Sequence, residues 1–560
     1  MQAVLYHGGP ILTMEPGPRP EALLTRGGAI AALGALSELS SLAPGARRVD
    51  LEGRTLLPAF LDPHSHITAL AATLSLCQLG AANSFEQIGL ALRAFAEARR
   101  LPPDAWVMGF GYDHNVLAER AHPTRQVLDR FFPDAPVLIT HASGHMGVAN
   151  SKSLALMGVT AETPDPEGGR IGREADGRTP SGYLEELAFR QATAKVPMDR
   201  AADAAAALDA AQQIYLSRGI TLIQDGLTGA DEFQMLSAAA RAGVFTADVV
   251  GYADLKKAPD LSSSPCWQTP VGGFRLGGWK IFLDGSPQGL TAWMLEPYQG
   301  GDGTYTGYPI YSDEEVTGFV RRALSDGAQL LAHCNGDAAA AQYIRCCRRA
   351  QEETGRAVRD IRPVMIHAQL VRPKQLAEMK ELGILPSFFA AHLWYWGDIH
   401  VENFGARRAA SISPLGAAER LGLPYTLHQD TPVIQPDMLE SVWCAVNRVT
   451  RSGAVLGPEY RVSPCAALRA VTANAAYQYR MEGRRGFWLY PAYINPCPRQ
   501  GRRSGAVGPR SHRRSAGGHP RAPGAGDHQG WSSGVSGVIS PASPIPVRIP
   551  SRKLWQHKTG

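Results

Sequence analysis

Residues 58–67, PAFLDPHSHI, place three polar side chains two positions apart inside an apolar run. Alternate side chains of a strand lie on the same face, so Asp62, His64 and His66 are predicted to point the same way. Two imidazoles side by side are typical of a metal site. The motif alone also fits one histidine hydrogen-bonded in the core and the other in a turn after Pro63. The metal interpretation therefore depends on further ligands elsewhere in the chain.

The composition indicates a large globular protein. The chain has 560 residues, of which 44% are hydrophobic, enough for a barrel with a satellite domain. The start, MQAVLYHGGPILTM, lacks the basic region and long apolar core of a secretory signal. No run approaches the roughly 18 apolar residues that span a bilayer. The eight cysteines are scattered without a Cys-x-x-Cys pair, as expected of reduced thiols, so we predict a cytoplasmic protein that does not enter a membrane.

Charge is distributed unevenly along the chain. The net charge is +5, but residues 480–560 hold 14 Lys and Arg against 2 Asp and Glu. Residues 1–479 therefore carry 42 basic and 49 acidic side chains, a balance of −7. A nucleic-acid-binding protein normally builds its basic patch into a folded face, so we expect no nucleic-acid partner. The basic tail is rich in Pro, Gly and Arg, which favours disorder.

Three regions differ in pattern. Residues 1–57 alternate short apolar runs with Gly-rich corners, which predicts strands and turns. Residues 84–215 have a helical pattern, as in SFEQIGLALRAFAEARR. From residue 219 onward, short apolar runs that end in polar residues alternate with helical stretches, for example GGWKIFLDGS and AQLLAHCNGDA. This rhythm predicts a parallel β/α architecture, whose active site lies at the carboxyl ends of the strands.

Six residues stand at or near the ends of these predicted strands. Taken singly, a histidine at a strand end is more often a satisfied core residue than a ligand. An aspartate before Thr-Pro can be a turn former, and a lysine in an apolar strand can extend to the barrel rim. All six together favour a metal site; they are His64, His66, Lys280, His333, His367 and Asp430.

The chain resembles the amidohydrolase superfamily, and within it the YtcJ-like branch (amidohydrolase family 3). The resemblance covers residues 5–478 and rests on GRTLLPAFLDPHSH, HASGHMGVANSKSLALMGV, KIFLDGSPQGLTAWMLEPY, AHCNGDAA, IHAQLV, HQDTPV and RVSPCAALRAVTANAAYQ. It implies a distorted (β/α)8 TIM barrel at 58–478, with the segment at 84–215 as a helical insertion. It also implies a small β-sandwich, formed by residues 1–57 and, in other members, by the C-terminal segment.

The resemblance also implies a site with one or two divalent metal ions, usually zinc. His64 and His66 would bind the more buried metal together with Asp430, and His333 and His367 would bind the second. Lys280 would bridge the two as a carbamate, although the sequence leaves its carbamylation open. Burial near cations lowers the pKa of a lysine, which supplies the neutral amine that carbamylation needs. Asp430 would act as the general acid and base.

Several further residues are candidates for the substrate pocket. His392, in FFAAHLWYWGDIH, is predicted to donate a hydrogen bond to the substrate carbonyl, with Trp394 and Trp396 against an apolar substituent. These rings could equally pack a loop over the barrel rim. In HASGH, His145 is the favoured pocket residue, with His141 as the alternative. Asp284 and Asp337 follow ligand-bearing segments and are expected to orient ligands.

The sequence departs from the family at two places. Ala59 replaces a usual glycine, which the backbone tolerates where φ is negative. Residues 479–560 replace the expected closing strands of the β-sandwich with a basic tail that we predict to be disordered. Whether this tail is a frameshift product or a divergent ending is left open. The six proposed ligands all precede it.

The combined prediction is a metal-dependent hydrolase that uses activated water to cleave a C–N bond of an amide, an N-substituted formamide or a related carbonyl compound. The alternatives are ester or lactone hydrolysis, deamination or isomerisation on the same metal site, and a non-catalytic binding protein with this fold. A small molecule is the expected partner, and a homodimer is left open. The sequence does not specify the substrate or the metal.

Overall fold

The computed structural model describes residues 2–196, 204–300, 303–483 and 489–492. The chain divides into two compact units, one formed by residues 1–58 and 487–560 and the other by residues 59–486. The larger unit holds all six proposed ligands.

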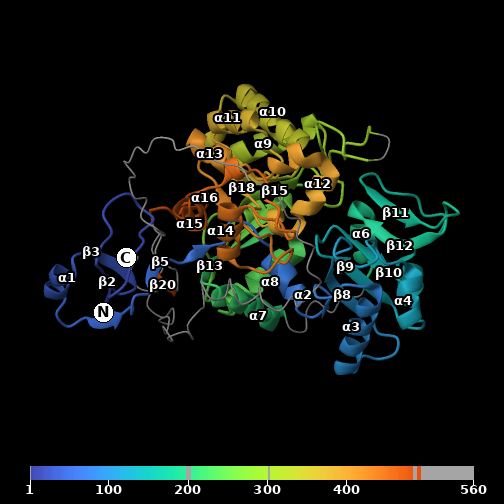
Figure 1. Ribbon diagram of the computed structural model, residues 1–560, viewed down its shortest axis with the longest axis horizontal. Helices are drawn as coiled ribbons and strands as arrows, with labels where there is room; N and C mark the ends of the chain where they lie inside the picture. The colour runs from blue at the N-terminus through green and yellow to red at the C-terminus, as the bar shows by residue number, and fades with distance from the viewer. Residues whose placement is uncertain (1, 197–203, 301–302, 484–488, 493–560) are drawn as a thin grey trace, which may run out of the picture. The chain divides into compact units, whose positions relative to one another are not determined.

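The centre of the larger unit is a curled sheet of eight strands (Figure 1), in the order β19-β18-β17-β16-β15-β14-β13-β6. Every neighbouring pair is parallel, and the sheet order follows the chain order. This arrangement fits a TIM-like barrel. The strands are β6 (Phe60–Leu61), β13 (Ile220–Thr228), β14 (Asp248–Asp254), β15 (Phe274–Phe282), β16 (Gln329–Cys334), β17 (Val364–His367), β18 (Leu385–Phe388) and β19 (Thr426–Leu427).

The first and last strands meet just beyond their carboxyl ends. The backbone N–H of Asp430 donates to the carbonyl of His64 at 3.2 Å, and that of His66 donates to Thr431 at 2.8 Å. These two hydrogen bonds join the segment after β19 to the segment after β6. Three of the proposed ligands are therefore held together by the same contacts that link the ends of the sheet.

Helices follow the strands, and their ends carry ordinary helix signals. Helix α9, for example, begins with a capping box between Ser312 and Glu315 and ends at Gly327, whose φ is +59°. The barrel helices are α2 (Ile67–Thr73), α7 (Ala204–Ser217), α8 (Ala230–Arg241), α9 (Asp313–Asp326), α10 (Asp337–Thr354), α11 (Pro373–Leu382), α12 (His392–Ala410), α13 (Leu415–Leu421), α14 (Met438–Asn447), α15 (Pro464–Ala470) and α16 (Ala473–Gln478).

Helix α16 and the residue that follows it complete the core inside the barrel. Ala475 and Ala476 of α16, with Tyr479, pack against inward side chains of the strands, including Leu222 and Leu331. All of these side chains are buried, because both faces of a parallel sheet are covered in such a fold. The mouth at the opposite end, where the strands finish, is left for polar side chains.

The segment between α2 and α7 is not the helical insertion that the sequence predicted. It contains a six-stranded mixed sheet, in the order β11-β12-β10-β9-β8-β7, with helices packed on it. The helix over SFEQIGLALRAF was predicted correctly. The strands β9 and β10 are short and almost wholly buried, so they lack the alternation that identifies a strand; β12, whose burial does alternate, was missed. The elements are β7 (Cys77–Gln78), α3 (Phe85–Ala98), β8 (Val107–Tyr112), α4 (Arg125–Phe131), β9 (Val137–His141), β10 (Met146–Ala149), α5 (Ser151–Met157), β11 (Gly169–Arg173), β12 (Pro180–Glu185) and α6 (Glu186–Thr193).

The smaller unit contains a four-stranded sheet, in the order β3-β2-β1-β4, and a separate pair of strands, β5 and β20. The antiparallel strand β20 lies within the tail that was expected to lack strands, so that expectation was too broad; residues 493–560 lie outside the described residues. The predicted β-sandwich stays a prediction. The strands are β1 (Ala3–His7), β2 (Ala22–Arg26), β3 (Ala29–Gly34), β4 (Arg47–Asp50), β5 (Thr55–Pro58) and β20 (Leu489–Ala492), with helix α1 (Leu36–Leu42).

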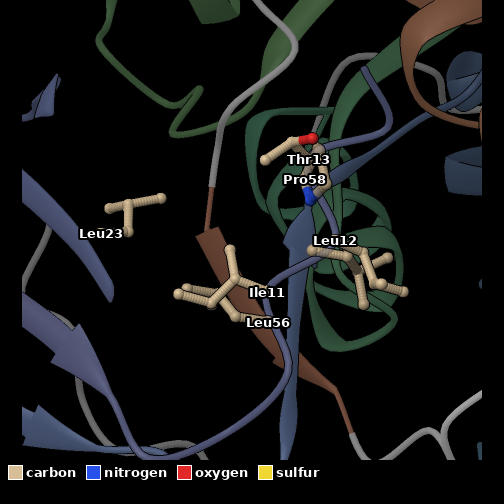
Figure 2. A pocket seen from close by; sticks show the side chains of 7 residues that line it. Ile11, Leu12, Thr13, Leu23, Leu56 and Pro58 are labelled. Atoms are coloured by element: carbon tan, nitrogen blue, oxygen red, sulfur yellow. The ribbon is translucent and has the colours of Figure 1, made fainter. Parts of the chain in front are cut away.

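A small apolar depression lies in this unit beside β5 (Figure 2). Its walls include Ile11, Leu23 and Leu56, and it has few polar groups. It contains none of the proposed ligands.

No described helix in either unit is long and apolar enough to cross a bilayer.

Candidate metal centre and active site

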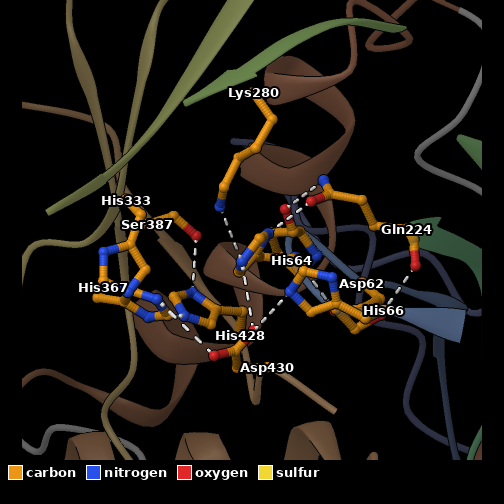
Figure 3. A network of polar contacts seen from close by, with 12 residues as sticks. Asp62, His64, His66, Gln224, Lys280, His333, His367, Ser387, His428 and Asp430 are labelled. Atoms are coloured by element: carbon orange, nitrogen blue, oxygen red, sulfur yellow. Dashed lines mark hydrogen bonds and ion pairs between the residues drawn. The ribbon is translucent and has the colours of Figure 1, made fainter. Parts of the chain in front are cut away.

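Asp430 is the centre of a group of imidazoles at the mouth of the barrel (Figure 3). Its Oδ1 lies 3.3 Å from Nε2 of His64 and 3.3 Å from Nε2 of His66, and its Oδ2 lies 3.7 Å from Nε2 of His367. Lys280 extends from β15, and its Nζ is 3.4 Å from Nε2 of His64. Five of the six predicted ligands are therefore within a few ångströms of one another.

The route by which His64 and His66 reach this position differs from the predicted one. Strand β6 ends at Leu61, because Pro63 cannot donate to a ladder, and both histidines lie in the segment that leads to α2. Asp62 does not share a face with them; its carboxylate accepts hydrogen bonds from the Ser65 hydroxyl and the His64 backbone. Burial raises the pKa of Asp62 to about 7. The expectation of three side chains on one strand face was wrong.

The tautomer of His64 is fixed by Gln224, in the middle of β13. The Gln224 amide group donates to the carbonyl of Pro63 at 2.7 Å and to the hydroxyl of Tyr479 at 2.8 Å. Its Oε1 is therefore turned toward Nδ1 of His64, 2.6 Å away, and accepts the proton of that nitrogen. Burial holds the pKa of His64 well below its usual value, so Nε2 presents a lone pair.

His367 is positioned by a chain of polar contacts and by a left-handed backbone. Its Nδ1 lies 3.0 Å from Nε2 of His428, whose Nδ1 is 2.9 Å from the Ser387 hydroxyl. His367 has a φ of +70° and Asp430 a φ of +54°, conformations that residues other than glycine rarely adopt. Such strain gathers at sites where the surroundings hold a functional geometry.

Lys280 is fully buried, and no carboxylate oxygen lies within 4.0 Å of its Nζ among the described ion pairs. Burial lowers the pKa of Lys280 to about 7, although Asp430 acts in the opposite direction. Its Nζ also lies 4.8 Å from the centre of the Phe282 ring. A substantial fraction of this amine is therefore neutral near neutral pH.

His333 lies beside the group but presents its nitrogens differently. Its ring centre is 4.6 Å from that of His367, but Nδ1 is 3.3 Å from Oδ1 of Asp284 and Nε2 is 3.3 Å from Nδ2 of Asn335. Nδ1 has no hydrogen-bond partner of good geometry among the described residues.

The donor atoms of the group fit a divalent cation. Oδ1 of Asp430 is buried without a hydrogen-bond donor of good geometry, and it faces the lone pair of His64 Nε2. The carboxylate is ionised: burial favours its neutral form, but electrostatic interactions with His66, His428 and Lys280 hold the pKa of Asp430 below its usual value. Two acceptors 3.3 Å apart repel each other unless a cation lies between them. Imidazole and carboxylate ligands are those that zinc prefers.

A second cluster of possible ligand type does not meet this test. Asp113, His114 and His141 lie within 4.8 Å of one another in the inserted sheet. However, the Ser143 backbone N–H donates to Nδ1 of His141 at 3.0 Å, so Nε2 carries the ring proton and faces Nδ1 of His114 at 3.3 Å. Oδ1 of Asp113 already accepts two hydrogen bonds from Asn115. Hydrogen bonds satisfy this cluster without a cation.

The predicted pocket residues of α12 are mostly enclosed. Nδ1 of His392 is 3.2 Å from Nε2 of His400, and the centre of the Phe389 ring is 4.5 Å from that of His392 and 5.3 Å from that of His428. Trp396 is buried, and its indole N–H donates to Asp113 at 2.9 Å. Trp394 packs edge-on against Trp443. These contacts favour the packing interpretation for the aromatic residues, and the catalytic role of His392 stays a prediction.

The other two candidates for orienting ligands have different surroundings. Asp284 is fully buried beside His333 and accepts backbone hydrogen bonds from Trp293, Asn335 and Gly336; burial raises its pKa to about 7. Asp337 instead binds Arg372 and the backbone of Leu295, which joins α10 to α11. No contact between Asp337 and a proposed ligand is described.

Sequence reasoning missed Gln224 and His428, although both left a signal. Each follows an apolar run of a predicted strand, in ITLIQDG and YTLHQDTP. At the mouth of such a barrel, a polar residue after an apolar run is a candidate ligand or a hydrogen-bond partner of a ligand. Gln224 and His428 could therefore have been found by asking which polar residues of the predicted strands had no assigned role.

Comparison with known proteins is consistent with this geometry. A sequence model described as "Amidohydrolase family" matches residues 47–488. The chain belongs to the amidohydrolase family. An N-substituted formamide deformylase of Arthrobacter pascens is 28% identical over 82% of this chain and 85% of its own length. The putative amidohydrolase YtcJ of Bacillus subtilis is 27% identical, over 82% and 86%.

Solved structures show the same fold for this amidohydrolase. The crystal structure of an uncharacterized metal-dependent hydrolase from Pyrococcus horikoshii superposes with a TM-score of 0.69 at 24% identity, covering 87% of this chain and 94% of that one. A second such hydrolase, from Pyrococcus furiosus, gives a TM-score of 0.68 at 24% identity, covering 87% and 99%. The predicted family and the TIM-like barrel are thereby confirmed.

Proposed function

We propose that this chain is a zinc-dependent hydrolase that cleaves the C–N bond of an amide, an N-substituted formamide or a related carbonyl compound. The observation that carries the proposal is the pair of acceptors, His64 Nε2 and Asp430 Oδ1, 3.3 Å apart at the mouth of the barrel. The relative in Arthrobacter that bears the name N-substituted formamide deformylase supports the choice of substrate class.

The proposed ligands divide as the sequence suggested. His64, His66 and Asp430 would hold one metal, and His367 and His333 a second. The Nδ1–H of His367 would donate a hydrogen bond to Nε2 of His428, whose Nδ1–H would donate to the Ser387 hydroxyl; Nε2 of His367 is then free to ligate. Bound metal lowers the pKa of water and polarises a carbonyl group.

Lys280 would complete the site as a carbamate. The neutral amine adds carbon dioxide through a new N–C bond and releases one proton, which converts a buried amine into an anion. Burial without a bound cation would oppose that anion, so carbamylation and metal binding are expected to support each other. The short distance between Lys280 and His64 suits such a bridge.

Asp430 is the proposed proton carrier. As an ionised carboxylate between His66 and His367, it would accept the proton of the attacking water and deliver it to the leaving nitrogen. Its left-handed backbone and the hydrogen bond from its N–H to His64 hold the carboxylate in place during both transfers.

Elemental analysis and turnover together test this proposal. Purified protein, with and without added zinc and bicarbonate, is analysed for metal and assayed for amine release from formanilide. We expect close to two metals per chain and hydrolysis that a chelator abolishes. A folded sample that binds no metal tightly and releases no amine would contradict the proposal and favour a binding protein. Faster turnover of phenyl formate, beyond its greater intrinsic reactivity, would favour the ester alternative.

A further inference from the structure

His145 and Glu186 form a buried pair at the edge of the proposed site. Nδ1 of His145, just before β10, lies 2.9 Å from Oε2 of Glu186 at the start of α6. The backbone N–H of Glu186 donates to the carbonyl of His145 at 2.8 Å, so the two residues are joined twice. The ring centre of His145 is 5.8 Å from that of the proposed ligand His333.

The Glu186 carboxylate is held rigidly and is charged. Its other oxygen, Oε1, accepts from the Thr291 hydroxyl at 3.0 Å, and its backbone has a φ of +49°. Burial favours the neutral acid, but the hydrogen bonds from His145 and Thr291, with the charge of Arg190, hold the pKa of Glu186 below its usual value. A non-glycine residue in this conformation is strained, as is typical of positions where the surroundings hold a functional geometry.

This pair fixes which nitrogen of His145 is free. A carboxylate only accepts hydrogen bonds, so Nδ1 carries a proton, and in the neutral imidazole Nε2 then presents a lone pair. No partner of Nε2 is described among the residues of the structure, and the side chain is 15% exposed. Nε2 is therefore an acceptor beside the metal ligands.

We infer that His145 accepts a hydrogen bond from an N–H group of the substrate, and that Glu186 positions it for this role. The enzyme would then select carbonyl compounds whose leaving nitrogen carries a hydrogen, such as secondary amides and N-monosubstituted formamides, over N,N-disubstituted amides and esters. This inference rests on the proposed function and names its substrate class more narrowly.

Three matched probes test the selection: formanilide, which has an N–H, N-methylformanilide, which lacks it, and phenyl formate. For each, kcat/KM and the dissociation constant are measured with zinc-loaded wild type, His145→Leu and the control His114→Leu, which removes a histidine of the inserted sheet. The ratio between formanilide and N-methylformanilide cancels out differences in intrinsic reactivity when variants are compared.

The ratio of kcat/KM for formanilide to that for N-methylformanilide is expected to be about tenfold higher in the wild type and in His114→Leu than in His145→Leu. The reason is that N-methylformanilide has no N–H for the desolvated Nε2 of His145 to accept. Equal ratios in wild type and His145→Leu, in both binding and turnover, would overturn the inference and leave the proposed function intact. Selective binding of formanilide that depends on His145, without hydrolysis of any probe, would support the inference and contradict the proposed function.

Discussion

Replacement of Gln224 by methionine would separate metal affinity from folding. The substitution keeps the side-chain volume and removes the oxygen that accepts the Nδ1 proton of His64 at 2.6 Å. It also removes two donors, but the Pro63 carbonyl keeps a 2.7 Å hydrogen bond from Gln478, and the Tyr479 hydroxyl keeps its own bond to Asp62 at 2.5 Å. Only His64 is left without its partner.

The expected loss of zinc affinity depends on where the His64 ring proton lies in the variant. Without Gln224, the ring proton can move to Nε2 and point at Asp430, which satisfies the metal-free protein at little cost. Metal binding must then return the proton to an unpaired, buried Nδ1, so zinc affinity should fall about 10- to 100-fold, or about 1.4–2.8 kcal/mol. The metal-free melting temperature should change by only a few degrees.

Competition with a fluorescent chelator measures the zinc affinity, and denaturant unfolding measures the stability of the metal-free protein. Gln478→Met is the matched control, because Gln478 donates to the same Pro63 carbonyl, and none of its described hydrogen bonds involves His64. Unchanged zinc affinity in Gln224→Met, or an equal loss in Gln478→Met, would refute the tautomer argument.

Three further outcomes are expected. Lys280→Ala should lower the metal content and abolish its dependence on bicarbonate, as measured by elemental analysis; a retained dependence would contradict a carbamate. Burial lowers the pKa of His400 to about 3, while the unfolded chain titrates near 6.5, so the unfolded state binds more protons between these values and stability falls as the pH is lowered. From pH 7.5 to pH 5 this residue alone should cost about 2 kcal/mol, and urea unfolding of His400→Gln should show a shallower loss. Arg448→Met should destabilise the protein by about 3–5 kcal/mol in the same assay, because four backbone carbonyls lose the guanidinium that donates to them. These carbonyls belong to Ala410, Ile412, Ser413 and Leu456. A loss of stability below about 1 kcal/mol would contradict this prediction.

The sequence predicted the barrel and the ligands for a common reason. Each apolar run after residue 219 forms a parallel strand, and the carboxyl ends of parallel strands meet at one mouth of the barrel. Polar residues at those ends, such as His367 and Asp430, therefore come together whatever the loops do. The inserted segment was harder to predict, because β10 is buried throughout and β9 at every residue except Thr140, so neither has an alternating pattern.

Protonation and partner choice could not be derived in the same way. His145 and Glu186 are 41 residues apart, and His64 and Gln224 are 160 apart, so nothing in their local sequence shows that they meet. The same holds for the cluster at Asp113, where a backbone N–H from Ser143 makes the difference between a metal site and a hydrogen-bonded group.

The sequence by itself determined the family, the parallel barrel and the residue types at its mouth, since these depend on strand order and on chemistry that each residue carries alone. The tertiary structure decided which nitrogen of each imidazole is free, because a proton is placed by the partner on the other side of the ring. It also decided which acceptors face each other without a donor, and that arrangement gives the site its affinity for a cation.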